Sequence, residues 1–162
     1  MGFDLYGMNA KSKEEGDYFR ANVWWWRPLW QYVTVACEDI LTEKDIERGN
    51  YNDGHRISKT KANRIASRLK IADKNGETMK YELGYKKHLK SLPKEECHIC
   101  NGQGMRNDEI GKQARKINRA YTCNGCEGEG STRNFNTHYP FESEEVIRFA
   151  EFCEQSGGFE IC

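Results

Sequence analysis

Four of the seven cysteines in this 162-residue chain stand in two copies of one short pattern. Residues 97–104 read CHICNGQG and residues 123–130 read CNGCEGEG, so each copy is Cys-x-x-Cys-x-Gly-x-Gly. Two thiolates at this spacing point inward from one tight turn, and two such pairs supply the four ligands of a tetrahedral Zn²⁺ ion. We therefore predict one structural zinc ion, with these ligands: Cys97, Cys100, Cys123 and Cys126.

The glycines after each cysteine pair belong to the same prediction. The chain has to turn back there so that its amides approach the sulfurs, and glycine permits the positive φ values that such a turn requires. One copy is half a site, which explains why the pattern occurs twice. The 22 residues between Cys100 and Cys123 exceed the usual ribbon spacing, so we expect a hairpin or flexible insert to close the gap.

Catalytic chemistry finds little support in the sequence. A redox dithiol is the rival reading of the cysteine pairs, but four thiolates around zinc leave no position for a catalytic water. The chain has no Gly-x-Ser-x-Gly, Walker or His-Glu-x-x-His motif. His55 with nearby Asp53 forms a possible acid–base pair, yet its turn-rich loop favours an incidental position. We therefore expect no enzyme, and the roles of three scattered cysteines stay open: Cys37, Cys153 and Cys162.

Composition and charge argue against several classes of protein. The 25 basic residues balance the 25 acidic residues, whereas proteins dedicated to duplex DNA usually carry a basic excess. Neither a secretory leader nor a membrane span of about 18 apolar residues is visible. An odd number of cysteines also argues against a disulfide framework. The expected location is the cytoplasm, without membrane contact.

The elements that position these residues are predicted to be mainly α-helical. Apolar spacing indicates helices over 28–41, 59–74, 77–91 and 144–156, with Ser58 and Ser143 as N-caps of the second and fourth. Pro28 is placed in the first turn of its helix, where proline is tolerated. We expect a helical core over 1–93, a zinc-ribbon or knuckle insert over 94–135, and a C-terminal part over 136–162 that completes the core.

The run Trp24-Trp25-Trp26-Arg27-Pro28-Leu29-Trp30 is the second candidate for a functional surface. The first three tryptophans are expected in an extended segment or short turn, and they cannot all face one core. Packing in the core is the simpler interpretation. The alternative is a recognition surface that stacks a nucleotide base or anchors a protein partner, with these binding residues: Trp24, Trp25, Trp26, Arg27 and Trp30.

The insert between the cysteine pairs is locally basic despite the neutral total. Arg115, Lys116 and Arg119 lie close together in it, within the stretch 106–119. A solvated loop or short helix is the simpler expectation, and contact with a nucleic acid or an acidic partner is the alternative. The predicted helix over 59–74 is also basic, in its part 59–70, so the two elements could share a face.

The repeated cysteine pattern resembles the zinc-binding module of DnaJ-type co-chaperones, and both copies match it at every fixed position. That module has four copies and two zinc ions, whereas this chain has two copies, enough for one zinc. No His-Pro-Asp signature of a J-domain is present. The resemblance therefore implies zinc ligation by the four cysteines and nothing about chaperone recruitment. Proteins such as anti-TRAP use two such copies around one zinc for protein–protein contact.

Other segments are similar to an uncharacterised family of small bacterial and bacteriophage proteins. The similarity lies in GFDLYGMN, in YFRANVWWWRPLW and in the ending YPFESEEVIRFAEFCEQSGGFEIC. It implies a single co-folded domain with the zinc module as an insert. It also associates the chain with a phage accessory or counter-defence role, and the expected location is then the host cytoplasm. We expect a zinc-stabilised module for protein–protein interaction, with nucleic-acid or nucleotide binding as the alternative.

Overall fold

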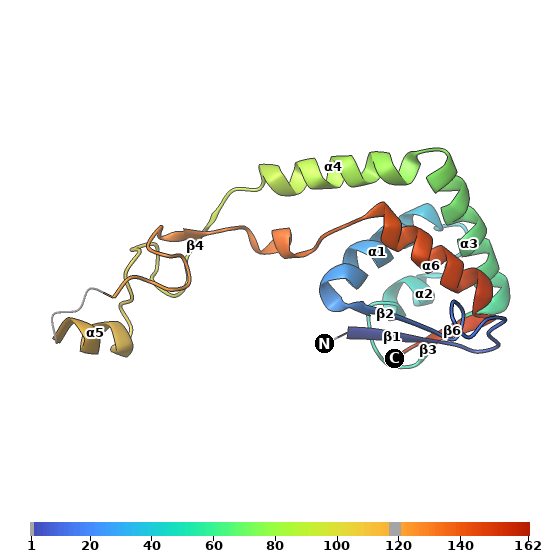
Figure 1. The fold of residues 1–162 in the computed structure, drawn as a ribbon, viewed down its shortest axis with the longest axis horizontal. Helices are drawn as coiled ribbons and strands as arrows, with labels where there is room; N and C mark the ends of the chain where they lie inside the picture. Colours follow the sequence, from blue (N-terminus) through green and yellow to red (C-terminus); the bar gives the residue numbers. More distant parts are fainter. Residues whose placement is uncertain (1, 117–120) are drawn as a thin grey trace. The chain divides into compact units, whose positions relative to one another are not determined.

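The structure is a computed structural model that describes residues 2–116 and 121–162, and it divides the chain into two compact units. The larger unit comprises Met1–Lys87 and Tyr139–Cys162, and the smaller unit comprises His88–His138. Figure 1 shows the elements of each. The predicted zinc insert over 94–135 falls within the residues of the smaller unit. No helix in the described ranges is long and apolar enough to cross a membrane.

The larger unit is built on a four-stranded antiparallel sheet that the sequence analysis does not predict. The strand order is β2-β1-β6-β3, with these bounds: β1 Gly2–Gly7, β2 Tyr18–Asn22, β3 His55–Ser58 and β6 Gly158–Ile161. In β1, Phe3 and Leu5 are buried and alternate with residues on the open face. The expectation of a mainly helical fold therefore holds only in part, because a sheet forms one layer of the core.

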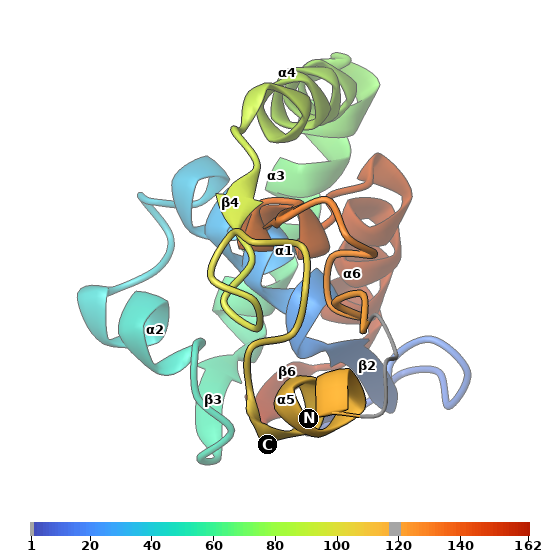
Figure 2. The same cartoon turned by 90° about the vertical axis from the view of Figure 1, so that its left-hand side faces the viewer.

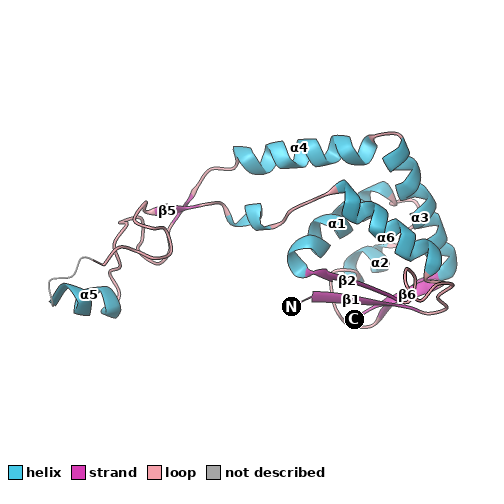
Figure 3. Ribbon diagram, in the orientation of Figure 1, coloured by secondary structure: helices cyan, strands magenta, loops and turns pink. Residues whose placement is uncertain are grey.

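Helices cover one face of this sheet, as Figures 1 and 2 show. Helices α3 and α6 pack side by side, and α1 contacts both the sheet and α3. Helices predominate along the chain, as the colours of Figure 3 show. The helices of the larger unit have these bounds: α1 Val23–Ala36, α2 Glu43–Arg48, α3 Lys59–Lys74, α4 Glu77–Ser91, which runs past the unit boundary, and α6 Ser143–Gln155.

Aromatic side chains fill the space between the sheet and the helices. Trp26 stacks between Phe3 at 5.3 Å and Trp30 at 5.4 Å, measured between ring centroids. Both indole N–H groups are satisfied, since Trp26 Nε1 donates to the Gly49 carbonyl at 2.8 Å and Trp30 Nε1 donates to the Ile46 carbonyl at 3.1 Å. Burying large rings with their N–H groups paired is favourable, so two of the four tryptophans form the core of this unit.

The start of α1 corrects the predicted boundary. Asn22 caps the helix, because its Oδ1 accepts hydrogen bonds from the backbone N–H groups of Trp24 and Trp25. The three adjacent tryptophans are therefore helical, not extended, and Pro28 lies inside the helix and not in its first turn. The helix also ends at Ala36, before the predicted end at residue 41.

The cap of α6 is also different from the prediction. Ser143 is the first helical residue, and the N-cap residue Glu142 makes no capping hydrogen bond through its side chain. Instead, the Ser143 backbone N–H and hydroxyl both donate to Oε2 of Glu82 on α4, at 2.7 Å and 2.5 Å. A carboxylate from a distant helix thus satisfies the N-terminus of α6. By contrast, Ser58 caps α3 as predicted, through Lys61 N.

The smaller unit contains little regular structure. Strand β4 Glu95–Glu96 pairs antiparallel with β5 Ser131–Thr132, and α5 Glu109–Lys116 lies between the two cysteine pairs in the chain. A 3₁₀ turn, Phe135–His138, follows β5. The buried apolar side chains described in this unit are those of the four patterned cysteines and Ala114, with Ile99 packed against the cysteines and partly buried. The unit therefore has almost no apolar core apart from the cysteine cluster.

Candidate metal centre

The four patterned cysteines meet in one buried cluster, with all four Sγ atoms within 4.8 Å of one another. Cys97 Sγ lies 3.7 Å from Cys123 Sγ, and Cys100 Sγ lies 3.6 Å from Cys126 Sγ. A tetrahedron with Zn–S bonds of about 2.3 Å has edges of about 3.8 Å, whereas a disulfide bond is about 2.0 Å long. These separations fit four ligands around one metal ion and do not fit disulfides.

The two copies of the pattern adopt the same local structure and contact each other reciprocally. Cys97 N donates to the Gly130 carbonyl, and Cys123 N donates to the Gly104 carbonyl, each at 2.9 Å. The residues that flank the copies also pair, β4 with β5 on one side and Met105 with Thr122 on the other. The repeat in the sequence therefore appears in space as two equivalent halves of one site.

The pattern glycines have the positive φ values that the sequence predicts, and two of them also lie against the other copy of the pattern. All four have positive φ values, 73° at Gly102, 72° at Gly104, 91° at Gly128 and 76° at Gly130. A Cβ atom on Gly104 would lie 2.3 Å from the Gly128 carbonyl oxygen, and one on Gly130 would lie 2.3 Å from the Gly102 oxygen. Any other residue at Gly104 or Gly130 would therefore be strained at this φ, and its side chain would collide with the other copy.

Backbone amides support negative charge on the sulfurs. Gly104 N donates to Cys100 Sγ and Gly130 N donates to Cys126 Sγ, each at 3.3 Å. Burial raises the pKa of Cys100 to about 11, against the effect of the Gly104 amide. The pKa of Cys97 is instead lowered to about 7. Burial raises this pKa, but hydrogen bonds from the backbone amides of Cys100 and Ile99 have the larger effect. A divalent cation at the centre would let all four sulfurs ionise together.

The tryptophan run does not form one surface. Trp26 and Trp30 are buried in the core, Trp25 is partly buried, and Arg27 is exposed on α1. Trp24 retains an exposed edge and packs on Tyr139 at 4.9 Å between ring centroids. The core interpretation is thus correct for Trp26 and Trp30, which are unavailable for stacking a base.

The predicted basic surfaces are divided between separate elements. Arg115 and Lys116 end α5, where the Lys116 side chain is exposed, and Arg119 lies outside the described residues. On α3, Lys61 pairs with Asp45, and Lys70 pairs with Glu154 at 2.7 Å. Arg64 and Arg68 of α3 both pair with Asp39, at 3.6 Å and 3.0 Å. Carboxylates within the chain therefore already neutralise much of the basic side of α3.

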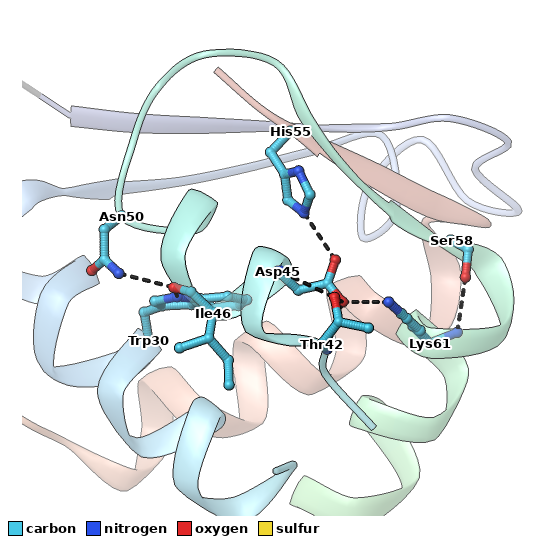
Figure 4. A network of polar contacts seen from close by, with 8 residues as sticks. All are labelled: Trp30, Thr42, Asp45, Ile46, Asn50, His55, Ser58 and Lys61. Carbon is cyan, nitrogen blue, oxygen red and sulfur yellow. Dashed lines mark hydrogen bonds and ion pairs between the residues drawn. The ribbon is translucent and has the colours of Figure 1, made fainter. Parts of the chain in front are cut away.

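His55 belongs to a polar network that the sequence analysis does not identify (Figure 4). It lies in strand β3, and its Nε2 atom lies 2.9 Å from Oδ1 of the buried Asp45, whereas Asp53 pairs with Arg48. Oδ2 of Asp45 accepts hydrogen bonds from Thr42 and Lys61. These donors lower the pKa of Asp45 despite the opposing effect of burial.

The Asp45 network joins α2, β3 and α3 through the contacts of Asp45 with Thr42, His55 and Lys61. Its local signal in the sequence is the capping box of α2, in which Thr42 and Asp45 are three residues apart. Neither that spacing nor the sequence around His55 reveals that both residues converge with Lys61. The possible acid–base pair of His55 with Asp53 is therefore replaced by a structural contact with Asp45.

Comparison with known proteins adds no identification, since no protein family, curated protein or solved structure matches the chain. The geometry of the cysteine cluster is consequently the firmest guide to function. It defines a site in which four buried sulfurs could hold one metal ion.

Proposed function

We propose that the chain is a zinc-binding protein that acts through protein–protein contact, with one structural zinc ion that folds the unit His88–His138. The observation that carries this proposal is the composition of that unit's interior, in which the cysteine cluster takes the place of an apolar core. Small units of this kind need a metal or disulfides to be stable. Four thiolates in tetrahedral spacing select zinc or iron, and a closed Cys₄ site is typical of structural zinc.

The surface of the same unit supports protein contact as its role. Several large apolar side chains are exposed there, namely Met105, Ile110 and Tyr121. A unit with almost no core to bury them in keeps them available for another protein. The likeness of the cysteine pattern to the co-chaperone module and to anti-TRAP agrees with a platform of this type.

Nucleic-acid or nucleotide binding is the weaker alternative. Trp26 and Trp30, two of the tryptophans predicted to stack bases, are buried. The cations of α3 are largely paired with carboxylates. Affinity for phosphate backbones depends on cations that are free to replace counterions. No observation on the described residues favours this alternative over protein contact.

Native mass spectrometry of the full chain tests the metal assignment. We expect one zinc ion per chain and its loss in Cys100→Ser, while the matched control Cys162→Ser keeps it, because Cys162 lies outside the cluster. Full zinc retention in Cys100→Ser, or iron in place of zinc, would contradict the proposal. Affinity capture with the zinc-loaded chain and with Cys100→Ser then tests protein contact, since partners bound through this unit should be recovered only with the former.

A further inference from the structure

One side of α4 carries features that the larger unit does not explain. The helix buries Thr78 and Glu82 and partly buries Tyr81 and Tyr85, which follow the spacing of a single helical face. The aromatic rings of this face pack on Phe141. The opposite side is exposed, and we call the following residues the outer face of α4: Met79, Lys80, Leu83, Gly84 and Lys87.

The outer face exposes two large apolar side chains. Met79 is 49% exposed and Leu83 is 63% exposed. Residues four apart on a helix are neighbours, so the two side chains lie next to each other one turn apart. An exposed pair of this kind, on a helix that already has a buried face, is available for contact with another molecule.

Gly84 lies at one edge of the same face, and no contact among the described residues requires a glycine there. Glycine is the least favourable residue in a helix interior after proline. A Cβ atom at Gly84 would meet no atom within 4 Å, whereas one at Gly111 in α5 would lie 2.0 Å from the Arg106 carbonyl oxygen. The missing side chain leaves a flat site where the backbone of a second helix can approach closely.

Two lysines flank this glycine. Neither Lys80 nor Lys87 forms an ion pair with any carboxylate that the structure describes, whereas the neighbouring Lys86 pairs with Glu82 at 2.6 Å. Lys87 also has no acidic residue three or four positions away in the helix. Seven residues of helix span about 10 Å, so the two cations stand on either side of Gly84 and within reach of one partner.

We propose that the outer face of α4 is a docking site for an acidic amphipathic helix of a partner protein, which crosses α4 at Gly84. The proposal rests on the proposed function in protein–protein contact and names the chemistry of the partner. Met79 and Leu83 contact its apolar stripe, and carboxylates of the partner pair with Lys80 and Lys87. A second copy of α4 is a poor occupant, because the basic faces would repel each other.

A defined peptide tests this docking site on the full zinc-loaded chain. The probe is a synthetic helical peptide with an alanine stripe and glutamates seven residues apart, compared with its twin in which lysines replace the glutamates. In ¹H–¹⁵N correlation NMR spectra, the acidic peptide should change the chemical shifts of residues on the outer face of α4, and the basic twin should not change them. Gly84→Leu should weaken binding at least about tenfold without lowering the thermal midpoint, because leucine favours the helix and its Cβ atom would meet no atom within 4 Å.

A charge swap supplies the second arm of the test. The double variant with Lys80→Glu and Lys87→Glu should no longer bind the acidic peptide and should bind the basic twin. Shifts elsewhere on the chain, equal binding of both peptides, or unaltered binding by Gly84→Leu would each overturn the proposal. Binding to vesicles of anionic lipid without binding to the peptide would overturn it as well, in favour of a membrane surface. Zinc content is measured separately, so failure of the metal assignment stays distinguishable from failure at α4.

Discussion

At the scale of single residues, two buried carboxylates hold elements together that are far apart in the chain. Asp45 connects the cap of α2 to β3 and α3 through Thr42, His55 and Lys61. Glu82 connects α4 to the N-terminus of α6 through Ser143. In both cases the carboxylate accepts hydrogen bonds from several donors, which is what makes a buried charge tolerable.

Replacing Asp45 by Asn should destabilise the larger unit markedly. The amide keeps the size of the side chain but loses the negative charge that faces Lys61 and His55, so the cation of Lys61 loses its partner. Breaking one side of a buried ion pair costs about 3–5 kcal/mol, and partial exposure of Lys61 places our expectation near the lower end. Urea unfolding measures the loss, and Asp53→Asn serves as the control because its pair with Arg48 is more exposed. Equal losses in the two variants would contradict the structural role of Asp45.

Glu82 should make stability depend on pH in the acidic range. Hydrogen bonds from Lys86 and Ser143 lower the pKa of Glu82 to about 2, against the effect of burial. A carboxyl group whose pKa is lower in the folded state stabilises the fold above its unfolded pKa of about 4.5, and this contribution disappears as the pH falls toward 2. Glu82→Gln should therefore cost about 1–3 kcal/mol at pH 7 and progressively less below pH 4.5.

Unfolding by urea at a series of pH values measures this difference. Glu151→Gln is the matched control, since Glu151 is exposed on α6 and forms no ion pair among the described residues. The control should change stability by less than about 0.5 kcal/mol across the range. A cost of Glu82→Gln that does not diminish on acidification would refute the assigned role of this carboxylate.

At the scale of elements, two glycines separate the effect of backbone strain from the effect of close contact between the two copies of the cysteine pattern. Gly104 and Gly76 have nearly the same φ, 72° and 75°, but a Cβ atom would collide with the Gly128 carbonyl only at Gly104. Gly76→Ala should cost about 1 kcal/mol from backbone strain alone. Gly104→Ala should cost more and should also lower zinc affinity, because the two halves of the site have to separate.

A competition between the protein and a coloured chelator measures zinc affinity in both variants. We expect Gly76→Ala to retain the affinity of the unaltered chain, because Gly76 lies in the turn between α3 and α4. If Gly104→Ala also retained full affinity, the close contact between the two copies would not be needed for the metal site.

Local patterns in the sequence predict the cysteine cluster, the bounds of α4 and the cap of α3, because each depends on residues close together in the chain. The sheet is different, since its strands are four to six residues long and β1 pairs with β6 from the opposite end of the chain. The apolar residues around Phe159 indicate a strand only once their pairing with β1 and β3 is known. The cap of α6 escapes prediction for the same reason, as it comes from Glu82 on another helix.

At the scale of the whole molecule, we expect the two units to obtain their stability from different sources. The larger unit buries a continuous aromatic and aliphatic core, which includes Trp26 and Phe149. The smaller unit depends on the cysteine cluster. The free energy of unfolding of the smaller unit should therefore depend on metal, whereas that of the larger unit should not.

Removal of the proposed zinc ion by a strong chelator should unfold residues 88–138 and leave the larger unit folded. Hydrogen exchange followed by mass spectrometry measures both units at once, and protection should disappear around Cys97–Cys126 while it persists in α3 and α6. The converse variant Trp26→Ala should lower the free energy of unfolding of the larger unit by about 3–5 kcal/mol. Its amides should then lose protection, while the smaller unit keeps its proposed zinc ion. Loss of protection in both units after chelation would mean that the metal also supports the aromatic core, and the division of stability argued here would be wrong.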